Sequence, residues 1–201
     1  MHRYSFNDGT ASDSVGGSAY AGSLMAGATV ANNQANFSSS GPYVNLPSGL
    51  FGSYTAVSVE AWVTTGVNTA WNRIFQFGAT SSTDSIAVWR NANSNTFLLV
   101  WCGSAAVENG KVYTSMPFNS QMNLHVVVTM SSGDVGRLYI NGVYKGSTPA
   151  VVTTIPSPTV FYVGKSFDGQ SGLVGSVNEF RIWGGALSAT DIATRYSQGP
   201  G

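Results

Sequence analysis

The stretch Arg137-Leu138-Tyr139-Ile140-Asn141-Gly142-Val143-Tyr144-Lys145 gives the clearest indication of the fold. Two runs of strand-like residues flank the dipeptide Asn-Gly. This dipeptide accepts positive φ at both central positions of a type I′ turn, whose twist matches that of paired strands. The stretch therefore predicts a tight antiparallel hairpin. Asn109-Gly110 predicts a second hairpin between residues 105–108 and 111–114, although its flanks alternate less regularly.

The same alternation of apolar and polar residues recurs along the chain in short runs, separated by clusters of Gly, Asn, Ser and Pro. Helical periodicity is almost absent. A dozen strands at this spacing predict two packed antiparallel sheets, an all-β jelly-roll sandwich. The predicted strands are residues 3–6, 29–36, 43–46, 57–64, 73–78, 85–90, 96–101, 124–130, 136–140, 143–147, 161–163 and 175–183.

One short helix is expected at the end of the chain. Ser188 and Asp191 have the spacing of a capping box, and apolar residues follow at helical spacing before Gly199 and Pro200 end the helix. No repeat and no second domain are visible, so residues 1–201 are predicted to form one domain. Residues 12–27 are predicted to be a long loop within it, of a kind that is often functional.

Composition narrows the possible functions. The chain of 201 residues is 43% hydrophobic but only 9% charged, and nine basic residues balance nine acidic ones. No stretch concentrates Lys or Arg as a nucleic-acid-binding surface requires, and no apolar run is long enough to insert into a membrane. The lone Cys102 has no second thiol and is expected to be a small core residue.

Six segments stand out in order along the chain: residues 2–9, 13–17, 57–63, 136–142, 175–183 and 186–189. They resemble the laminin G-like jelly-roll domains of the concanavalin A-like lectin/glucanase superfamily. The resemblance spans nearly the whole chain in the family's order, and it implies a pair of antiparallel sheets with loops gathered at one rim. Members of the wider superfamily use this fold for sugars, protein ligands and, in some branches, hydrolysis, so the fold alone does not choose among these functions.

The sequence offers little material for catalysis. Glucanases that resemble this fold carry Glu-x-Asp-x-x-Glu on one strand, because two carboxylates must face one sugar linkage about 5 Å apart. That triplet is missing, as is the Gln-Ile-His of jelly-roll lyases, and only His2 and His125 could serve a Ser-His-Asp system or a zinc site. Acids distant in sequence could still converge in space. His125 is expected to be a strand histidine bonded to a neighbour.

Glu60 lies in the middle of a predicted strand, where a carboxylate needs a partner. We expect an ion pair with an arginine such as Arg181 or Arg73. The rival interpretation makes Glu60 a catalytic acid. Loss of folding in Glu60→Gln supports the ion pair, whereas an intact fold without glycan hydrolysis supports catalysis.

A structural Ca²⁺ is a further expectation. Calcium takes hard oxygen ligands, and backbone carbonyls of a glycine-rich loop can supply several. In domains that this chain resembles, a metal often bridges the early loop and the last long strand. The resemblance implies Asp13 as side-chain ligand, Gly16 and Ser18 as carbonyl donors, and Asn178 or Glu179 from the strand. The alternative is an Asx-turn at Asp13 without metal.

Ligand contact is expected at the loops, where exposed aromatic rings can stack on the C–H face of a sugar. Trp62, Trp101 and Trp183 are expected to pack in the core, whereas Trp71 could serve either role. The predicted rim residues are Asp84, Trp89, Arg90, Asn91, Asp168 and Gln170.

Three functions follow in order of preference. The first is a non-catalytic recognition or adhesion module, stabilised by calcium, which binds a carbohydrate or surface protein on behalf of a larger extracellular, cell-surface or virion protein. The second is a structural spacer or decoration domain without a ligand. The third is a glycoside hydrolase or polysaccharide lyase.

Overall fold

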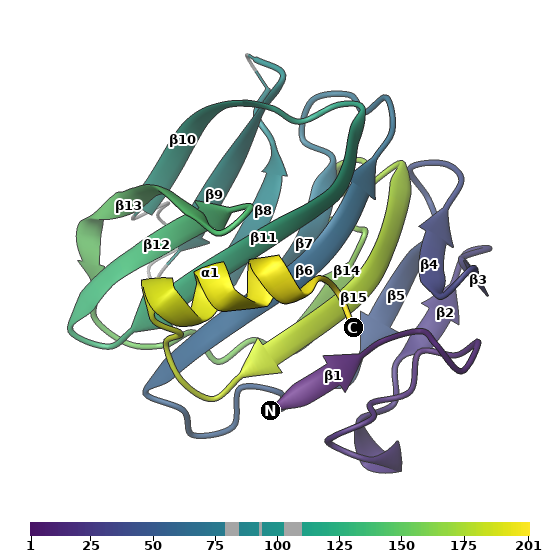
Figure 1. Cartoon of the computed structure of the whole chain (residues 1–201), viewed down its shortest axis with the longest axis horizontal. Helices are drawn as coiled ribbons and strands as arrows, with labels where there is room; N and C mark the ends of the chain where they lie inside the picture. Colours follow the sequence, from purple (N-terminus) through teal and green to yellow (C-terminus); the bar gives the residue numbers. More distant parts are fainter. Residues whose placement is uncertain (79–84, 93, 103–109) are drawn as a thin grey trace.

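The structure, a computed structural model, describes residues 1–78, 85–92, 94–102 and 110–201. Two antiparallel sheets are packed face to face as a sandwich (Figure 1), which confirms the predicted fold class. Sheet A has the strand order β13 (Val143–Val152), β12 (Asp134–Ile140), β11 (Gln121–Ser131), β6 (Ala56–Thr65), β15 (Gly175–Trp183), β4 (Gln34–Phe37) and β3 (Thr29–Ala31), and β1 (His2–Tyr4) also pairs with β15.

Sheet B forms the second layer. Its order is β10 (Gly110–Pro117), β9 (Thr96–Cys102), β8 (Ser85–Arg90), β7 (Arg73–Gly78), β14 (Val160–Val163), β5 (Tyr43–Leu46) and β2 (Ser23–Met25). A single-turn 3₁₀-helix, η1 (Ser18–Tyr20), precedes β2, and the helix α1 (Ala189–Gln198) ends the chain.

The core lies between the sheets, where alternate residues of each strand point inward. Phe77 of sheet B and Phe180 of sheet A are both fully buried, and their ring centroids lie 5.8 Å apart. Phe161 packs against Phe77 at 4.8 Å. The Phe77–Phe180 contact joins the two layers, and the residues that alternate with these inward side chains point to the outer face of each sheet.

Two local predictions are confirmed by backbone and cap geometry. Asn141 and Gly142 have φ values of 52° and 75°, as the type I′ hairpin between β12 and β13 requires. Ser188 caps α1: its hydroxyl accepts the Asp191 N–H at 3.1 Å, while the Asp191 carboxylate accepts the Ser188 N–H.

The predicted strand 29–36 is wrong, because it is a hairpin of two strands, β3 and β4. Asn32 and Asn33 both have positive φ, 54° and 58°, so the pair forms the turn that Asn-Gly forms elsewhere. The predicted loop 12–27 also contains η1 and β2. All three residues of β2 are exposed, so this strand shows no alternation of buried and exposed positions. Strands β9 and β10 pair antiparallel, while residues 103–109 of their predicted turn lie outside the described part.

Helix α1 lies across the outer face of sheet A (Figure 1), rather than at its edge. Ile192 of the helix is fully buried and packs with Val127 of β11 and Tyr139 of β12. Part of the outer face of sheet A is thereby covered, and the two termini of the chain come to lie near each other beside β15 (Figure 1).

Candidate functional site

The outer face of sheet B carries a cluster of aromatic and polar side chains around Arg73. The Arg73 guanidinium lies 3.9 Å from the centroid of the Trp89 ring, donates from Nε to Gln76 Oε1 at 3.1 Å, and pairs with Asp168 at 3.1 Å. A β-bulge between β7 and β8 produces this contact. Arg73 pairs with Trp89 but Phe75 pairs with Val88, so Ile74 is the extra residue.

Trp71 forms the exposed part of this cluster. Its side chain is 38% exposed, and its ring lies 6.1 Å from Trp89 in an edge-to-face arrangement. The backbone of Trp71 has φ 68°, a conformation that costs energy for a bulky residue and that often accompanies functional sites. Its N–H donates to Arg90 O at 3.1 Å, and its carbonyl accepts from Arg73. An aromatic surface is therefore held rigidly beside an arginine–carboxylate pair.

The predicted rim residues lie around the same cluster, with one correction. Trp89 is only 5% exposed, because it packs with Ala87 and Leu98 beneath Arg73, and so it is not an exposed aromatic. Its Nε1–H has no hydrogen-bond partner among the described residues. A buried donor without an acceptor is rare and calls for a water or ligand acceptor.

The other predicted rim residues flank the arginine. Asp168 is paired with Arg73 and its side chain is 31% exposed, while the exposed Gln170 donates its N–H to Asp168 Oδ1 at 3.4 Å. Arg90 and Asn91 follow Trp89 on the chain and are half-buried. Asp84 lies outside the described residues. Ligand binding by these residues stays a prediction.

A second aromatic centre on the same face escaped sequence analysis. Tyr43 and Tyr162 form an edge-to-face pair with centroids 4.9 Å apart, and the Lys165 ammonium lies 3.9 Å from the Tyr43 ring. Tyr162 lies opposite Gln76 on the neighbouring strand β7, and Gln76 accepts a hydrogen bond from Arg73. The tyrosine pair is therefore next to the Arg73 cluster. Both tyrosines occupy outward positions of alternating strands, a pattern that could have identified them.

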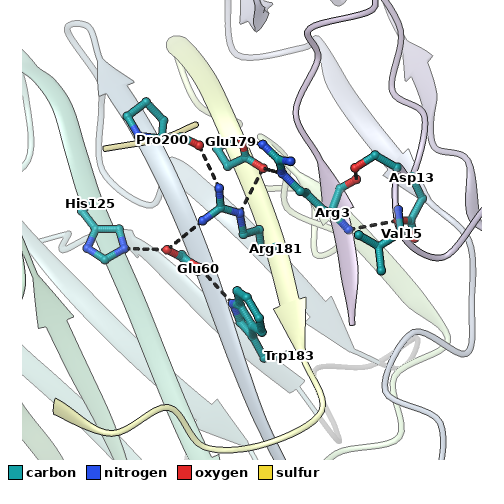
Figure 2. Close-up of polar contacts among 10 residues, drawn as sticks. Arg3, Asp13, Val15, Glu60, His125, Glu179, Arg181, Trp183 and Pro200 are labelled. Atoms are coloured by element: carbon teal, nitrogen blue, oxygen red, sulfur yellow. Dashed lines mark hydrogen bonds and ion pairs between the residues drawn. The ribbon is translucent and has the colours of Figure 1, made fainter. Parts of the chain in front are cut away.

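The outer face of sheet A carries a different arrangement, a buried ionic network (Figure 2). Glu60 is fully buried and accepts hydrogen bonds from His125 Nε2 at 2.9 Å, Trp183 Nε1 at 2.9 Å and Arg181 Nη1 at 3.4 Å. The expected ion pair between Glu60 and Arg181 is confirmed, as is a bonded neighbour for His125. Trp62 is also buried, but it stacks on His125 at 4.7 Å rather than in the sandwich core.

A second carboxylate joins this network because of another bulge. Val177 of β15 pairs with Val63 and Glu179 with Trp62, so Asn178 is the extra residue and Glu179 points outward together with Arg181. Glu179 is fully buried and accepts from Arg3 Nε at 2.7 Å and from Arg181 Nε at 3.1 Å. Figure 2 shows Arg181 between the two glutamates.

Two acids distant in sequence, Glu60 and Glu179, thus converge, but their surroundings support ion pairing rather than acid catalysis. Both side chains are inaccessible to solvent and each faces an arginine. Burial raises the pKa of Glu60, but hydrogen bonds from His125 and Trp183 and the charge of Arg181 outweigh it and hold that pKa below its ordinary value. A general acid for glycoside hydrolysis needs the opposite shift.

The residues of the expected calcium site do not fit a calcium ion as they are arranged. Asp13 Oδ1 accepts the N–H groups of Arg3, Val15 and Gly16 at 2.7–3.0 Å, and its Oδ2 contacts His2 Nδ1 at 2.6 Å. Burial raises the pKa of Asp13, but the hydrogen bonds from these donors lower it by more, so this pKa lies below its ordinary value.

Gly16 contacts Asp13, but Arg3 lies between Asp13 and the expected strand ligand Glu179. The backbone of Arg3 binds Asp13 while its guanidinium binds Glu179 (Figure 2). Asn178 is the bulged residue of β15, and Ser18 begins η1. In the described part of the chain, no three His, Cys, Asp or Glu side chains lie together in a way that could hold a metal ion. Calcium binding stays a prediction, and it would require Asp13 to exchange its hydrogen-bond donors for the ion.

Within the described ranges, none of the helices has the length and apolar character needed to traverse a lipid bilayer.

Comparison with solved structures shows the same fold in three settings. Domain 4 of an extracellular GH43 arabinanase from Geobacillus stearothermophilus, in complex with arabinotriose, has a TM-score of 0.70 at 20% identity, with 96% of each chain covered. Trypanosoma rangeli sialidase in complex with sialic acid has a TM-score of 0.75 at 19% identity. A structure of botulinum neurotoxin type C, whose cell entry depends on interaction with two ganglioside molecules, has a TM-score of 0.76 at 18% identity.

The chain is 98% covered in the last two comparisons but spans about one third of the sialidase, 32%, and half of the toxin chain, 50%. No curated protein matches the sequence. The sequence profile of a laminin G family, described as the Concanavalin A-like lectin/glucanases superfamily, matches residues 38–193. These residues include most strands of both sheets and the first half of α1. The chain therefore belongs to the concanavalin A-like lectin/glucanase superfamily.

Proposed function

We propose that this chain is a non-catalytic carbohydrate-recognition module, which binds a sugar on the outer face of sheet B. The observation that carries the proposal is the cluster of Trp71, Trp89 and Arg73. The Trp71 ring is 38% exposed, and it packs edge-to-face on Trp89 beside the partly exposed carboxylate that pairs with Arg73, Asp168. A sugar offers a C–H face that stacks on the exposed Trp71 ring, and its hydroxyl groups can donate to the Asp168 carboxylate beside it.

The polar side chains around Trp71 are suited to sugar hydroxyls. Asp168 is partly exposed, and its ion pair with Arg73 already fixes the side chain. Its carboxylate can therefore accept from a sugar hydroxyl with little further loss of side-chain entropy. Gln170 and Asn91 add amide groups at the same edge. Tyr43, Tyr162 and Lys165 extend the surface across β14 and β5, which favours an oligosaccharide over a single sugar.

Similar structures support a binding role. The arabinanase domain was solved with arabinotriose, and the toxin structure concerns gangliosides. Because these neighbours are extracellular or act at cell surfaces, we also propose an extracellular location for this chain, as part of a larger protein. The paired, inaccessible glutamates of sheet A favour binding over hydrolysis.

The test is a glycan array followed by titration calorimetry with any glycan that binds. Replacing Trp71 with Ala is expected to weaken binding at least tenfold, equivalent to about 1.4 kcal/mol, while the melting temperature changes little. The matched control is Tyr144→Ala, which removes an exposed aromatic ring (51%) from sheet A and should leave affinity unchanged.

Absence of binding to every glycan would favour a structural spacer. Release of reducing ends or unsaturated sugars from a polysaccharide would establish catalysis instead. Equal weakening by Trp71→Ala and Tyr144→Ala would place the ligand elsewhere.

A further inference from the structure

A pocket of about 370 Å³ opens where β1, β15 and the C-terminal end of α1 meet. It lies on the outer face of sheet A, and so on the opposite side of the sandwich from the proposed sugar surface. Three arginines and a tryptophan line it, namely Arg3, Arg181, Arg195 and Trp183, and no aspartate or glutamate side chain is part of its lining.

Two of the arginines are held in place by carboxylates that lie behind them (Figure 2). Arg3 binds Glu179 through Nε at 2.7 Å and Nη2 at 3.1 Å, and its side chain is 30% exposed. Arg181 bonds to both glutamates and donates from Nη2 to Pro200 O at 2.8 Å. Glu60 and Glu179 are inaccessible to solvent and do not line the pocket, so they contact the arginines from behind.

The third arginine is not bonded to a carboxylate of the described residues, although its charge acts on Asp191 one turn earlier on α1. Arg195 of α1 lies over the Trp183 ring, with the guanidinium carbon 3.8 Å from the ring centroid. It makes no ion pair with the described residues, and its buried Nε has no hydrogen-bond partner there. Arg3 and Arg181 are thus paired with buried glutamates, whereas the guanidinium of Arg195 lines the pocket without an ion pair to a described side chain.

The backbone at the end of the chain approaches these groups closely. A Cβ on Gly201 would lie 3.1 Å from Arg3 Nη2 and 3.2 Å from Arg181 Nη2. The glycine lets the two guanidinium groups remain at the wall of the pocket, where a side chain would displace them.

We propose that this pocket binds the carboxylate of a small organic anion. The planar fork of a guanidinium matches the two oxygens of a carboxylate, and Arg195 has the free donors to make that contact. Trp183 holds the guanidinium flat from below, which reduces the entropy lost on binding. A carboxylate could come from a free organic acid or from an acidic sugar. The proposal does not depend on the sugar surface of sheet B.

The test is NMR titration of the 201-residue chain with sodium acetate, sodium glucuronate and glucose at constant ionic strength. Saturable shifts of the Arg195 Nε–H and Trp183 Nε1–H resonances are expected with at least one carboxylate and not with glucose. Binding of both salts with equal affinity would show that the carboxylate alone is recognised, and tighter binding of glucuronate would identify an acidic sugar.

Variants locate the site. Arg195→Gln is expected to reduce affinity at least tenfold, whereas Lys145→Gln, which removes the same charge from an exposed position on β13, should not. Arg195→Lys keeps the charge but loses the fork, and we expect a loss of affinity there too, even if Arg195→Gln proves unstable. The proposal is overturned if neither salt gives saturable shifts, if glucose gives the same shifts, or if Arg195→Lys binds like the wild-type chain.

Discussion

Replacing Glu60 with Gln tests whether the ionic network of sheet A stabilises the fold. The carboxylate is fully buried and accepts three hydrogen bonds, from His125, Arg181 and Trp183. Gln has almost the same shape but no charge, and its NH₂ group would face one of these donors. Removing one partner of a buried ion pair costs about 3–5 kcal/mol. Because Arg181 keeps Glu179 as a partner, we expect the lower end, about 3 kcal/mol.

This cost is large enough to measure in two ways. For a domain of this size, 1 kcal/mol corresponds to about 2–4 °C, so the melting temperature should fall by roughly 7 °C. The urea midpoint, followed by tryptophan fluorescence, should fall with an unchanged slope, because the surface exposed on unfolding is the same. The matched control is Asp134→Asn, which removes a carboxylate paired with Arg137 where both side chains are partly exposed, 49% and 34%. Solvent screens that pair, so little change is expected.

The reasoning is refuted if Glu60→Gln melts at the same temperature as the wild-type chain, or if Asp134→Asn costs as much. An intact fold combined with loss of glycan hydrolysis would instead support the catalytic interpretation of Glu60.

Three further predictions concern pH, a turn and calcium. The pKa values of Glu60 and Asp13 are lowered in the folded chain, so their stabilisation is complete above the unfolded values, about 4, and is lost as the pH falls through the folded values. The urea midpoint should therefore drop on acidification, less steeply in Glu60→Gln, and a constant midpoint would contradict this. Gly142→Ala, at φ 75° and with its new Cβ 3.2 Å from Tyr196, should cost about 1–2 kcal/mol. Gly9→Ala, at φ 79° with open space around the Cβ, should cost less when both are compared by urea unfolding. If Asp13 exchanges its donors for calcium, the chain melts at a higher temperature in calcium than in EDTA, and identical melting curves remove the calcium expectation.

Local sequence patterns sufficed for most strands and for the helix. Alternation predicted β5, β7, β8 and β15 with the bounds that the structure has, because each strand has one face in the core and one outside. The Asn-Gly turn and the Ser188–Asp191 capping box depend on contacts within four residues, so no tertiary information was needed. The partner of Glu60 was also predictable, since a buried carboxylate requires a cation.

The candidate site was predicted in part. Residues 89–91, Asp168 and Gln170 do lie around one cluster, but sequence analysis assigned exposure to Trp89 and did not identify Arg73 as the centre. Whether an indole is covered depends on which arginine lies over it, and that arginine comes from the neighbouring strand. Alternation places Tyr43 and Tyr162 on the outward face of their strands, but it does not predict their contact, because β5 and β14 are far apart in the chain and adjacent only in sheet B.

The sequence by itself determined the strand-forming segments, their turns, the final helix and the demand for an ion pair at Glu60. Only the tertiary structure decided which outward side chains meet. Bulges at Ile74 and Asn178 shift the alternation by one residue: the first places Arg73 against Trp89, and the second turns Glu179 and Arg181 to the outer face, where Arg181 pairs with Glu60. A bulge depends on how two distant strands align, and that alignment is set by packing of the whole sandwich rather than by the residues of either strand alone.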